Sequence, residues 1–277
     1  MAKKNASRDR ERWQVPVGGK GFALKDRDPG DKPFSSGDKE ADKRRVAELS
    51  TEIDALQDIF WAERRLGLLV LLQGTDTAGK DGTIRAVFKE TSPLGVRTQG
   101  WKAPTELERS HDYLWRIHAM MPAAGEFMIH NRSHYEDVLV PVVNGWIDGK
   151  TTRQRYRQIN DFERMLSENG TVIMKFMLHI SKDKQRERLQ ERVDDPTKHW
   201  KFSLDDLEVR KQWPDYQRAY QDLLRATSTD WAPWTVVPAD SKTHRNLMIA
   251  TLVRDRLQSL KLRYPPDDPR LKGLDVQ

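Results

Sequence analysis

A glycine-rich segment with one lysine contains the residues of this sequence that are best suited to chemistry on phosphate. It reads Gly74-Thr75-Asp76-Thr77-Ala78-Gly79-Lys80-Asp81-Gly82, and its core spacing, G-x-x-x-x-G-K, is that of a phosphate-binding loop. Glycines let the backbone curl so that successive N–H groups point inward, where a following helix also presents its positive N-terminus. Lys80 adds a mobile positive charge, so the segment predicts a phosphoryl-transfer site.

Two acidic residues make this loop unusual. Asp81 follows the lysine, where a Ser or Thr hydroxyl ordinarily holds Mg²⁺, and Asp76 lies inside the loop. A carboxylate beside phosphates repels them unless a metal ion lies between the two, or unless the carboxylate orients an attacking phosphate. Asp76 could instead cap the N–H groups of its own loop. We favour the metal-binding or catalytic role for Asp76.

A second set of candidates follows a later apolar segment, in the run Asn131-Arg132-Ser133-His134-Tyr135-Glu136. The carboxyl ends of parallel strands converge on the ligand crevice of an α/β sheet, so Arg132 is expected to reach the phosphates. Asn131 stands where phosphate-loop enzymes usually carry an aspartate, and it would be a weaker metal ligand. A lone arginine at a strand end is often structural, but the neighbouring loop favours phosphate binding.

Basic residues are also dense between positions 182 and 201. In nucleoside and nucleotide kinases, an arginine-rich lid helix closes over the phosphates and excludes water. The alternative is a solvated helix face, because Asp183, Glu187 and Glu191 interleave at spacings that allow pairs within the helix. The basic residues are Lys182, Lys184, Arg186, Arg188, Arg192, Lys198 and Lys201, and the last two flank a His-Trp pair that fits no regular pattern.

An α/β fold would bring these segments together. Residues 68–72 form a short continuous apolar run, typical of a strand buried on both faces of a parallel sheet. Strand-like and helix-like segments alternate after it, which favours a mostly parallel sheet with helices on both faces. Further strands are expected near 96–101, 127–130, 171–180 and 234–238, and helices at 80–90, 105–118, 133–143, 153–168, 181–193, 204–227 and 241–261. The helix at 105–118 would carry a capping box at Thr105 and Glu108 and would place His111 and His118 on one face, as packing residues.

Two segments precede the first strand. Residues 39–65 carry a helical stripe of apolar residues, which we expect to pack on the core; the stripe is Val46, Leu49, Ile53, Leu56 and Phe60. Residues 1–38 have few apolar residues, and their first 26 contribute +4 to the charge, with seven Lys or Arg and three Asp or Glu. This composition predicts a basic extended arm, draped over the domain or free as a solvated tail.

The composition excludes some classes of protein and favours others. The net charge is +6, which suits a polyanionic partner as well as a solvated basic surface. The absence of cysteine excludes disulfides, thiolate nucleophiles and cysteine-ligated zinc. Apolar runs are too short for a membrane span or a signal-peptide core, so we expect a cytoplasmic location. We expect one catalytic domain over 39–277, with a lid at about 182–212.

Taken in order, these segments resemble the family-2 polyphosphate kinases. The pattern G-x-D-x-x-G-K-D-G is followed by Lys102-Ala103-Pro104, by the run Asp112 to His118 and by Asn131 to Glu136. The run Arg192 to Lys201 resembles the lid segment of that family. The resemblance extends from about residue 21 to 260 and leaves the first residues unmatched.

The resemblance implies a P-loop kinase-like three-layer α/β/α fold, similar to thymidylate kinase, with a helical lid. It implies transfer of a phosphoryl group from inorganic polyphosphate to a nucleotide, with Mg²⁺ (or Mn²⁺) as cofactor. By that similarity Asp76 would position the metal and the acceptor phosphate, while Lys80 and Arg132 would hold the phosphates in transit. The lid residues Arg188, Arg192, Lys198 and Lys201 would contact polyphosphate or close over the reaction.

The same resemblance bears on the acceptor. The form Asn131-Arg132-Ser133-His134-Tyr135-Glu136 is similar to that of the subgroup accepting both nucleoside mono- and diphosphates, here AMP and ADP or their guanine equivalents. Asn131 and Glu136 would then lie at the nucleotide. Glu136 is the candidate for the residue that allows both mono- and diphosphates to be accepted. A dimer or tetramer is the expected assembly.

Four alternatives to this mechanism and function can be weighed on the residues. No histidine is placed to argue for a phosphohistidine, so direct in-line transfer is expected. An ATP-dependent nucleoside or nucleotide kinase on the same fold would explain loop and lid, but not Asp76 and Asp81. A basic nucleic-acid-binding protein, using some of the nine tryptophans as stacking platforms, ranks third. A GTPase is disfavoured because the sequence contains no N-K-x-D motif.

Overall fold

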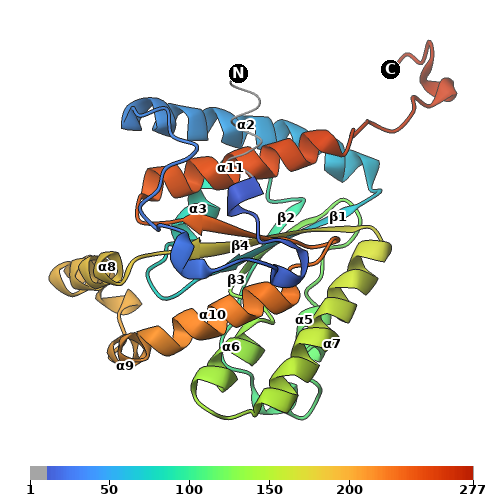
Figure 1. Ribbon diagram of the computed structural model, residues 1–277. Coiled ribbons are helices and arrows are strands. Elements are labelled where there is room, and N and C mark those ends of the chain that lie inside the picture. Colours follow the sequence, from blue (N-terminus) through green and yellow to red (C-terminus); the bar gives the residue numbers. More distant parts are fainter. Residues whose placement is uncertain (1–10, 277) are drawn as a thin grey trace.

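The computed structural model describes residues 11–276, and its centre is a five-stranded parallel sheet (Figure 1). The strand order is β2-β3-β1-β4-β5. Every residue of β1 is buried, which confirms the strand predicted from the apolar run at 68–72. The bounds are β1 (Gly67–Gln73), β2 (Val96–Gly100), β3 (Phe127–Asn131), β4 (Thr171–His179) and β5 (Trp234–Pro238).

The register of the strands brings the two sets of candidate residues to one edge. Leu72 of β1 pairs with Asn131 of β3, so the chain leaves both strands at the same height. The phosphate-binding loop follows β1, and Arg132 follows β3. The neighbourhood that the sequence predicted is therefore a direct result of parallel pairing between adjacent strands.

Helices cover both faces of the sheet and complete the three-layer α/β/α architecture that was predicted (Figure 1). The first layer comprises α2 (Lys39–Glu63), α3 (Lys80–Val87) and α11 (Lys242–Ser259). The opposite layer comprises α6 (Glu136–Val143), α7 (Gly149–Glu168) and α10 (Trp213–Thr227). No helix in the described part of the chain is long and apolar enough to cross a membrane.

A projecting segment lies beyond the carboxyl ends of the strands (Figure 1). It comprises α8 (Lys182–Asp194), the 3-10 helix η3 (Pro196–Lys201) and α9 (Asp205–Lys211), and we term residues 182–212 the lid segment. Ser181 caps α8 by accepting from the Lys184 N–H at 3.1 Å. The lid segment stands where the basic lid was expected.

Two predicted helices are each broken in two. The helix expected over 204–227 ends with α9 and restarts as α10, because Pro214 lacks an N–H and is tolerated only in a first turn. The helix expected over 105–118 is instead α4 (Glu106–Arg109) and α5 (Trp115–His118). Between them Asp112 accepts a hydrogen bond from the Leu114 N–H, a local bond that competes with helix.

Of the two features predicted for the helix at 105–118, the capping box is confirmed and the shared face of the two histidines is not. The capping box at the start of α4 is present, with both reciprocal hydrogen bonds. His111 and His118 do not share one helix. His111 stacks on Trp115, with ring centroids 4.1 Å apart, and His118 packs edge-on against Phe162.

The N-terminal arm contributes to the core, so the solvated tail is the wrong interpretation for its described part. Trp13, Val15, Phe22 and Leu24 are all buried. The Val15 N–H donates to the Trp234 carbonyl at 2.8 Å, and the arm thereby covers the edge strand β5. Two 3-10 helices, η1 (Val17–Gly19) and η2 (Leu24–Asp26), follow. Residues 1–10 of the predicted arm lie outside the described residues.

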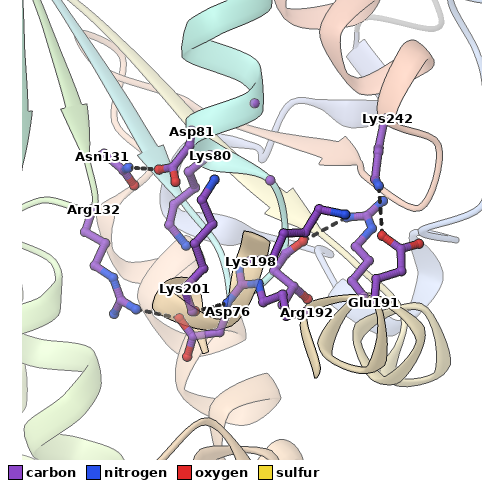
Figure 2. A pocket seen from close by; sticks show the side chains of 14 residues that line it. Asp76, Lys80, Asp81, Asn131, Arg132, Glu191, Arg192, Lys198, Lys201 and Lys242 are labelled. Atoms are coloured by element: carbon purple, nitrogen blue, oxygen red, sulfur yellow. Dashed lines mark hydrogen bonds and ion pairs between the residues drawn. The ribbon is translucent and has the colours of Figure 1, made fainter. Parts of the chain in front are cut away.

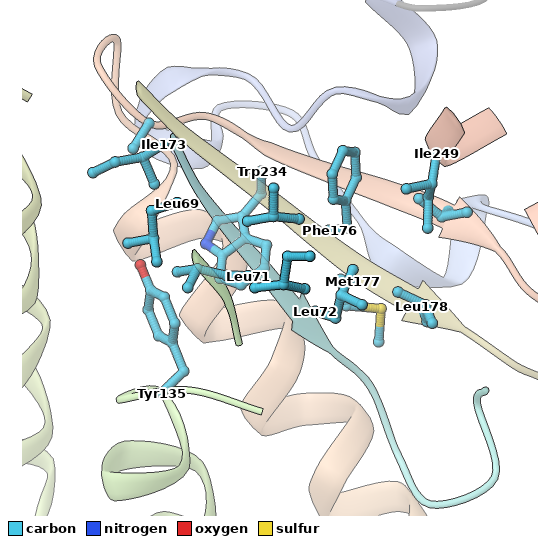
Figure 3. Close-up of a cluster of buried hydrophobic side chains, with 14 of the residues drawn as sticks. Leu69, Leu71, Leu72, Tyr135, Ile173, Phe176, Met177, Leu178, Trp234 and Ile249 are labelled. Carbon is cyan, nitrogen blue, oxygen red and sulfur yellow. The ribbon is translucent and has the colours of Figure 1, made fainter. Parts of the chain in front are cut away.

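The core is built mainly around β1 and β4 (Figure 3). Leu69 and Leu71 of β1 and Trp234 of β5 are fully buried among the aliphatic side chains of β4. The stripe predicted on α2 also faces inward, with Val46, Leu49, Ile53 and Phe60 buried and Leu56 partly so. Beyond α11 the chain ends in an exposed tail that contains the 3-10 helix η4 (Pro269–Leu271).

Candidate active site

The loop between β1 and α3 has the backbone shape of an anion-binding cradle. Gly74, Thr77 and Gly79 all have positive φ, at 148°, 64° and 103°. A Cβ on Gly74 would lie 2.6 Å from the Leu178 carbonyl oxygen, so only glycine fits there. The loop ends at Lys80, where α3 begins and where its N-terminal N–H groups open toward the same space.

Lys80 is held against its own loop. Its ammonium group donates to the carbonyl oxygens of Gly74 at 2.8 Å and Thr75 at 3.3 Å. Burial, and then the neighbouring Arg132, lower the pKa of Lys80 to about 8. Within the described part of the chain this lysine forms no salt bridge, which leaves its charge available to a bound phosphate.

Arg132 forms ion pairs with two carboxylates at the end of β3. One terminal nitrogen lies 2.6 Å from Oδ1 of Asp76, and the other lies 2.7 Å from Oε2 of Glu136. The Arg132 backbone has a φ of 65°, a conformation that non-glycine residues rarely adopt, and its N–H donates to the Leu72 carbonyl. The Glu136 carboxylate raises the pKa of Arg132, so its charge is permanent at working pH.

Asp81 and Asn131, the two residues that depart from the usual phosphate-loop pattern, contact each other. The side-chain amide of Asn131 donates to Oδ1 of Asp81 (Figure 2). A carboxylate after the lysine and an amide at the strand end thus replace the usual hydroxyl and aspartate. Asp81 and Asp76 are the loop carboxylates that face the cavity.

A cavity of 360 Å³ lies in front of the loop, between β3 and the lid segment. Figure 2 shows Lys80 and the lid cations around it. Besides the two loop aspartates, the acidic residue that lines this cavity is Glu191, which pairs with Lys242 at 3.2 Å. Its basic members are Lys80, Arg132, Arg188, Arg192, Lys198, Lys201 and Lys242. The excess of cations suits a polyanion.

Arg188 lies at the cavity, as the sequence suggested, but its guanidinium donates to the backbone of the protein itself. Both of its terminal nitrogens donate hydrogen bonds to backbone carbonyl oxygens, at 2.7 to 3.3 Å. The acceptors are Thr77, Ala78, Ala239 and Asp240. Arg188 therefore supports the phosphate-binding loop and ties it to the chain after β5.

A second cavity, of 560 Å³, adjoins the first, and the two share Asp76 and Arg132. It lies between α6 and the second half of the lid segment, and Gly74 and Glu136 also border it. Aromatic and aliphatic side chains line it, among them Leu139, Val140, Tyr216 and Tyr220. The lid segment adds Asp205, Asp206 and Glu208, together with Lys211, which pairs with Glu208 at 2.7 Å.

The loop that follows β3 rests on a buried ion pair. The Lys175 ammonium group lies 2.6 Å from Oε2 of Glu163, and both side chains are fully buried. The Tyr135 hydroxyl donates to Glu163 at 2.8 Å, and Nε2 of His134 lies 3.2 Å from the same carboxylate. Because these two residues closely follow Arg132, the ion pair fixes the backbone that carries it.

The structure thus brings together almost all of the residues predicted for the site. Thr77, Gly79 and Gly82 border the first cavity with the charged residues, whereas the Ala78 side chain is buried and borders neither cavity. Sequence reasoning missed Lys242 and the two tyrosines of the second cavity. They lie far along the chain from the loop, and no local spacing marks them.

Comparison with known protein sequences identifies similar proteins over most of the chain. A sequence model of the family described as Polyphosphate kinase 2 (PPK2) matches residues 36–265. The chain is 46% identical over 267 residues to the AMP/ADP-polyphosphate phosphotransferase of Meiothermus ruber, covering 96% of this chain and 100% of that protein. It is 40% identical over 236 residues to the ADP-polyphosphate phosphotransferase of Rhodopseudomonas palustris, covering 80% and 82%.

Solved structures agree with the sequence matches. The crystal structure of Polyphosphate Kinase 2 from Arthrobacter aurescens superposes with a TM-score of 0.90 at 43% identity, over 96% of this chain and 93% of that chain. A crystal structure from Pseudomonas aeruginosa, described as a putative polyphosphate kinase 2, superposes with a TM-score of 0.80 at 34% identity, over 86% of this chain and 50% of that chain. These likenesses confirm the predicted kinase fold.

Proposed function

The chain belongs to the polyphosphate kinase 2 family, and we propose that it transfers the terminal phosphoryl group of inorganic polyphosphate to AMP and ADP. The observation that carries the proposal is the pair of adjoining cavities, one rich in cations and one lined by aromatic and aliphatic side chains, which meet at Asp76 and Arg132. Two cavities that share a border suit two substrates that must exchange a group.

The basic cavity suits the donor. Its cations come from the phosphate-binding loop, from the end of β3 and from the lid segment, so a chain of phosphates would be neutralised along its length. Arg192, Lys198 and Lys201 would act from the lid segment. The lid would also exclude water, which competes with the nucleotide as acceptor.

The second cavity suits the nucleotide. Its aromatic and aliphatic walls offer contact to a base and ribose, while the shared border holds the acceptor phosphate beside Arg132. Asp76 and Glu136 orient that arginine, and Asn131 lies next to it in the chain. The Meiothermus ruber relative is named for both AMP and ADP, which supports acceptance of both here.

The reaction itself needs no covalent intermediate with the protein. An oxygen of the acceptor phosphate attacks the terminal phosphorus of polyphosphate in line, and the bond from that phosphorus to the bridging oxygen breaks. The nucleotide gains one phosphate and the polymer loses one. Because one phosphoanhydride bond forms as another breaks, the step is reversible. Lys80 and Arg132 neutralise charge on the transferred group, and the N–H groups of the loop hold its oxygens.

Magnesium fits the acidic residues of the first cavity. No group of three or more His, Cys, Asp or Glu side chains in the described residues could hold a metal alone. Mg²⁺ usually takes one or two carboxylates and completes its shell with phosphates and water, so Asp76, with Asp81, would suffice. When bound, the ion would reduce the charge on the phosphates, and Mn²⁺ could replace it.

The experiment that tests this function compares donors and acceptors. Pure protein is incubated with Mg²⁺, AMP or ADP, and either long-chain polyphosphate, ATP or no donor, and the nucleotides are separated by ion exchange. Products that appear with polyphosphate and are lost in Lys80→Ala support the proposal. Phosphorylation from ATP alone would instead support a nucleotide kinase. Conversion of ADP without AMP would remove the proposed breadth and the role of Glu136 in it.

The assembly and the location remain predictions. The predicted homo-oligomer of two or four copies can be tested by measuring the molar mass of the protein by light scattering at micromolar concentration. A cytoplasmic location is tested by fractionating cells that express the protein.

A further inference from the structure

Arg245 is a buried cation directly behind the phosphate-binding loop. It lies in the first turns of α11, and only 3% of its surface is exposed. A Cβ on Gly79 would lie 1.9 Å from one of its terminal nitrogens, and a Cβ on Gly82 would lie 3.3 Å from the other. The guanidinium therefore occupies space that these two glycines leave free, and it does not border the basic cavity.

All the hydrogen bonds of Arg245 go to neutral acceptors. Nη1 donates to the Ala78 carbonyl at 3.0 Å, while Nε and Nη2 donate to the Asn246 side-chain oxygen at 3.2 and 2.9 Å. The Ala78 carbonyl also accepts from Arg188 at 3.3 Å, so one peptide oxygen receives two guanidinium groups. Two like charges thus meet at one carbonyl of the loop.

Neither arginine forms a salt bridge within the described part of the chain. Carboxylates act on Arg188 from a distance, Asp240 most strongly, and they partly oppose the lowering of its pKa by burial. Among the described residues, no carboxylate opposes the lowering of the Arg245 pKa in this way. Burial, and then Arg188, lower the pKa of Arg245 to about 9, and the guanidinium still carries its charge at neutral pH.

A buried charge without a counter-charge is unfavourable, and proteins rarely retain one that has no use. The space that could supply a counter-charge is the basic cavity in front of the loop, where the donor would bind. Gly79 and Gly82, which lie against the guanidinium, also border that cavity, and water screens a buried charge weakly.

We propose that Arg245 is a positioning residue for the donor, whose buried charge attracts polyphosphate through the loop without contacting it. The inference rests on the proposed function, because it takes polyphosphate as the anion in the basic cavity. A purely structural role would need only the hydrogen bond to Ala78. The electrostatic role needs the charge.

Two variants separate these roles. Arg245→Gln removes the charge and keeps one donor for the loop carbonyl, whereas Arg245→Lys keeps the charge and loses the guanidinium geometry. Lys150→Gln, at an exposed position on α7, controls for the loss of one positive charge from the whole protein. Arg245→Met gives a second uncharged variant if the glutamine protein does not fold.

The measurements are the Kd of polyphosphate of defined chain length, by titration calorimetry, and the KM values for polyphosphate and ADP. Arg245→Gln is expected to weaken polyphosphate binding about tenfold, the size of one weakly screened charge interaction. Its KM for ADP should stay within about twofold of the wild-type value, and Arg245→Lys should retain most of the affinity. The thermal midpoint of ligand-free Arg245→Gln should equal or exceed that of the wild type.

The opposite pattern overturns the inference. If the lysine and glutamine variants lose affinity equally, and both lower the ligand-free thermal midpoint, Arg245 only shapes the loop. An unchanged polyphosphate Kd in Arg245→Gln also overturns it, while leaving the proposed function intact. Wild-type protein that neither binds polyphosphate nor uses it would overturn the proposed function, and this inference with it.

Discussion

Nη2 of Arg132 lies 2.6 Å from Oδ1 of Asp76, and this ion pair stands where the two cavities meet. The second terminal nitrogen of Arg132 pairs with Glu136 at 2.7 Å. One planar guanidinium is thus fixed from two sides, with its charge at the border that a phosphoryl group would cross. Lysine has a single ammonium group and cannot reproduce this geometry.

Replacing Arg132 by lysine should therefore lower kcat by about 100-fold, the usual cost of losing one aligned donor to a reacting group. The expected readout is the initial rate of ATP formation from ADP at saturating polyphosphate. Arg218→Lys, which alters an exposed ion pair on α10, is the matched control. A kcat within threefold of wild type in Arg132→Lys would contradict the placing of Arg132 at the transferred group.

The lowered pKa of Lys80 predicts a pH dependence. With a pKa of about 8 in the free enzyme, Lys80 is charged below that pH and increasingly neutral above it. Since kcat/KM reports groups of the free enzyme, kcat/KM for polyphosphate should fall as pH rises through about 8. Lys80→Arg, whose side chain stays protonated, should lose this decline despite its lower activity. A wild-type profile that stays level to about pH 9.5 would argue against the assignment.

Removal of Arg188 should affect stability first. Its guanidinium is the donor for four backbone carbonyls, and unsatisfied buried acceptors are costly. We expect Arg188→Met to lose roughly 3 kcal/mol in the free energy of unfolding, measured by urea denaturation. Arg186→Met, on the exposed face of the same helix, should change it by less than about 0.5 kcal/mol. Equal stability of the two variants would refute the supporting role.

The buried pair of Lys175 and Glu163 predicts a non-additive result. Lys175→Met leaves a buried carboxylate without its partner and should lower the free energy of unfolding by about 3–5 kcal/mol. Adding Glu163→Leu removes that charge, so the double variant should regain part of the loss despite carrying two substitutions. Urea denaturation of both single variants and the double variant completes the cycle. Strictly additive losses would mean that the two side chains do not depend on each other.

The sequence predicted the parts of the site that local patterns encode. The apolar run of β1, the glycine spacing after it and the start of α3 define a strand-loop-helix unit within some twenty residues. Parallel pairing then places Arg132 beside the loop, which follows from the fold class alone. Helix breaks were missed where side chains and proline compete with continuous helix, at Asp112 and Pro214.

Interactions between residues far apart in the chain were not predictable in this way. Arg245 lies more than 160 positions after Ala78, whose carbonyl it binds, and nothing in its neighbours marks it as buried. A signal did exist for the ion pair of Lys175 and Glu163. Lys175 stands in the middle of an apolar strand and Glu163 lies on the apolar face of α7, and two opposite charges in such places indicate a buried pair.

The most direct test of the account is the initial rate of ATP formation while polyphosphate and ADP are varied together. Two adjoining cavities that hold both substrates at once predict intersecting lines in a double-reciprocal plot, with no rate when polyphosphate is omitted. Parallel lines would indicate a phosphorylated enzyme and contradict direct transfer. A rate that does not depend on polyphosphate would contradict the assignment of the basic cavity to the donor.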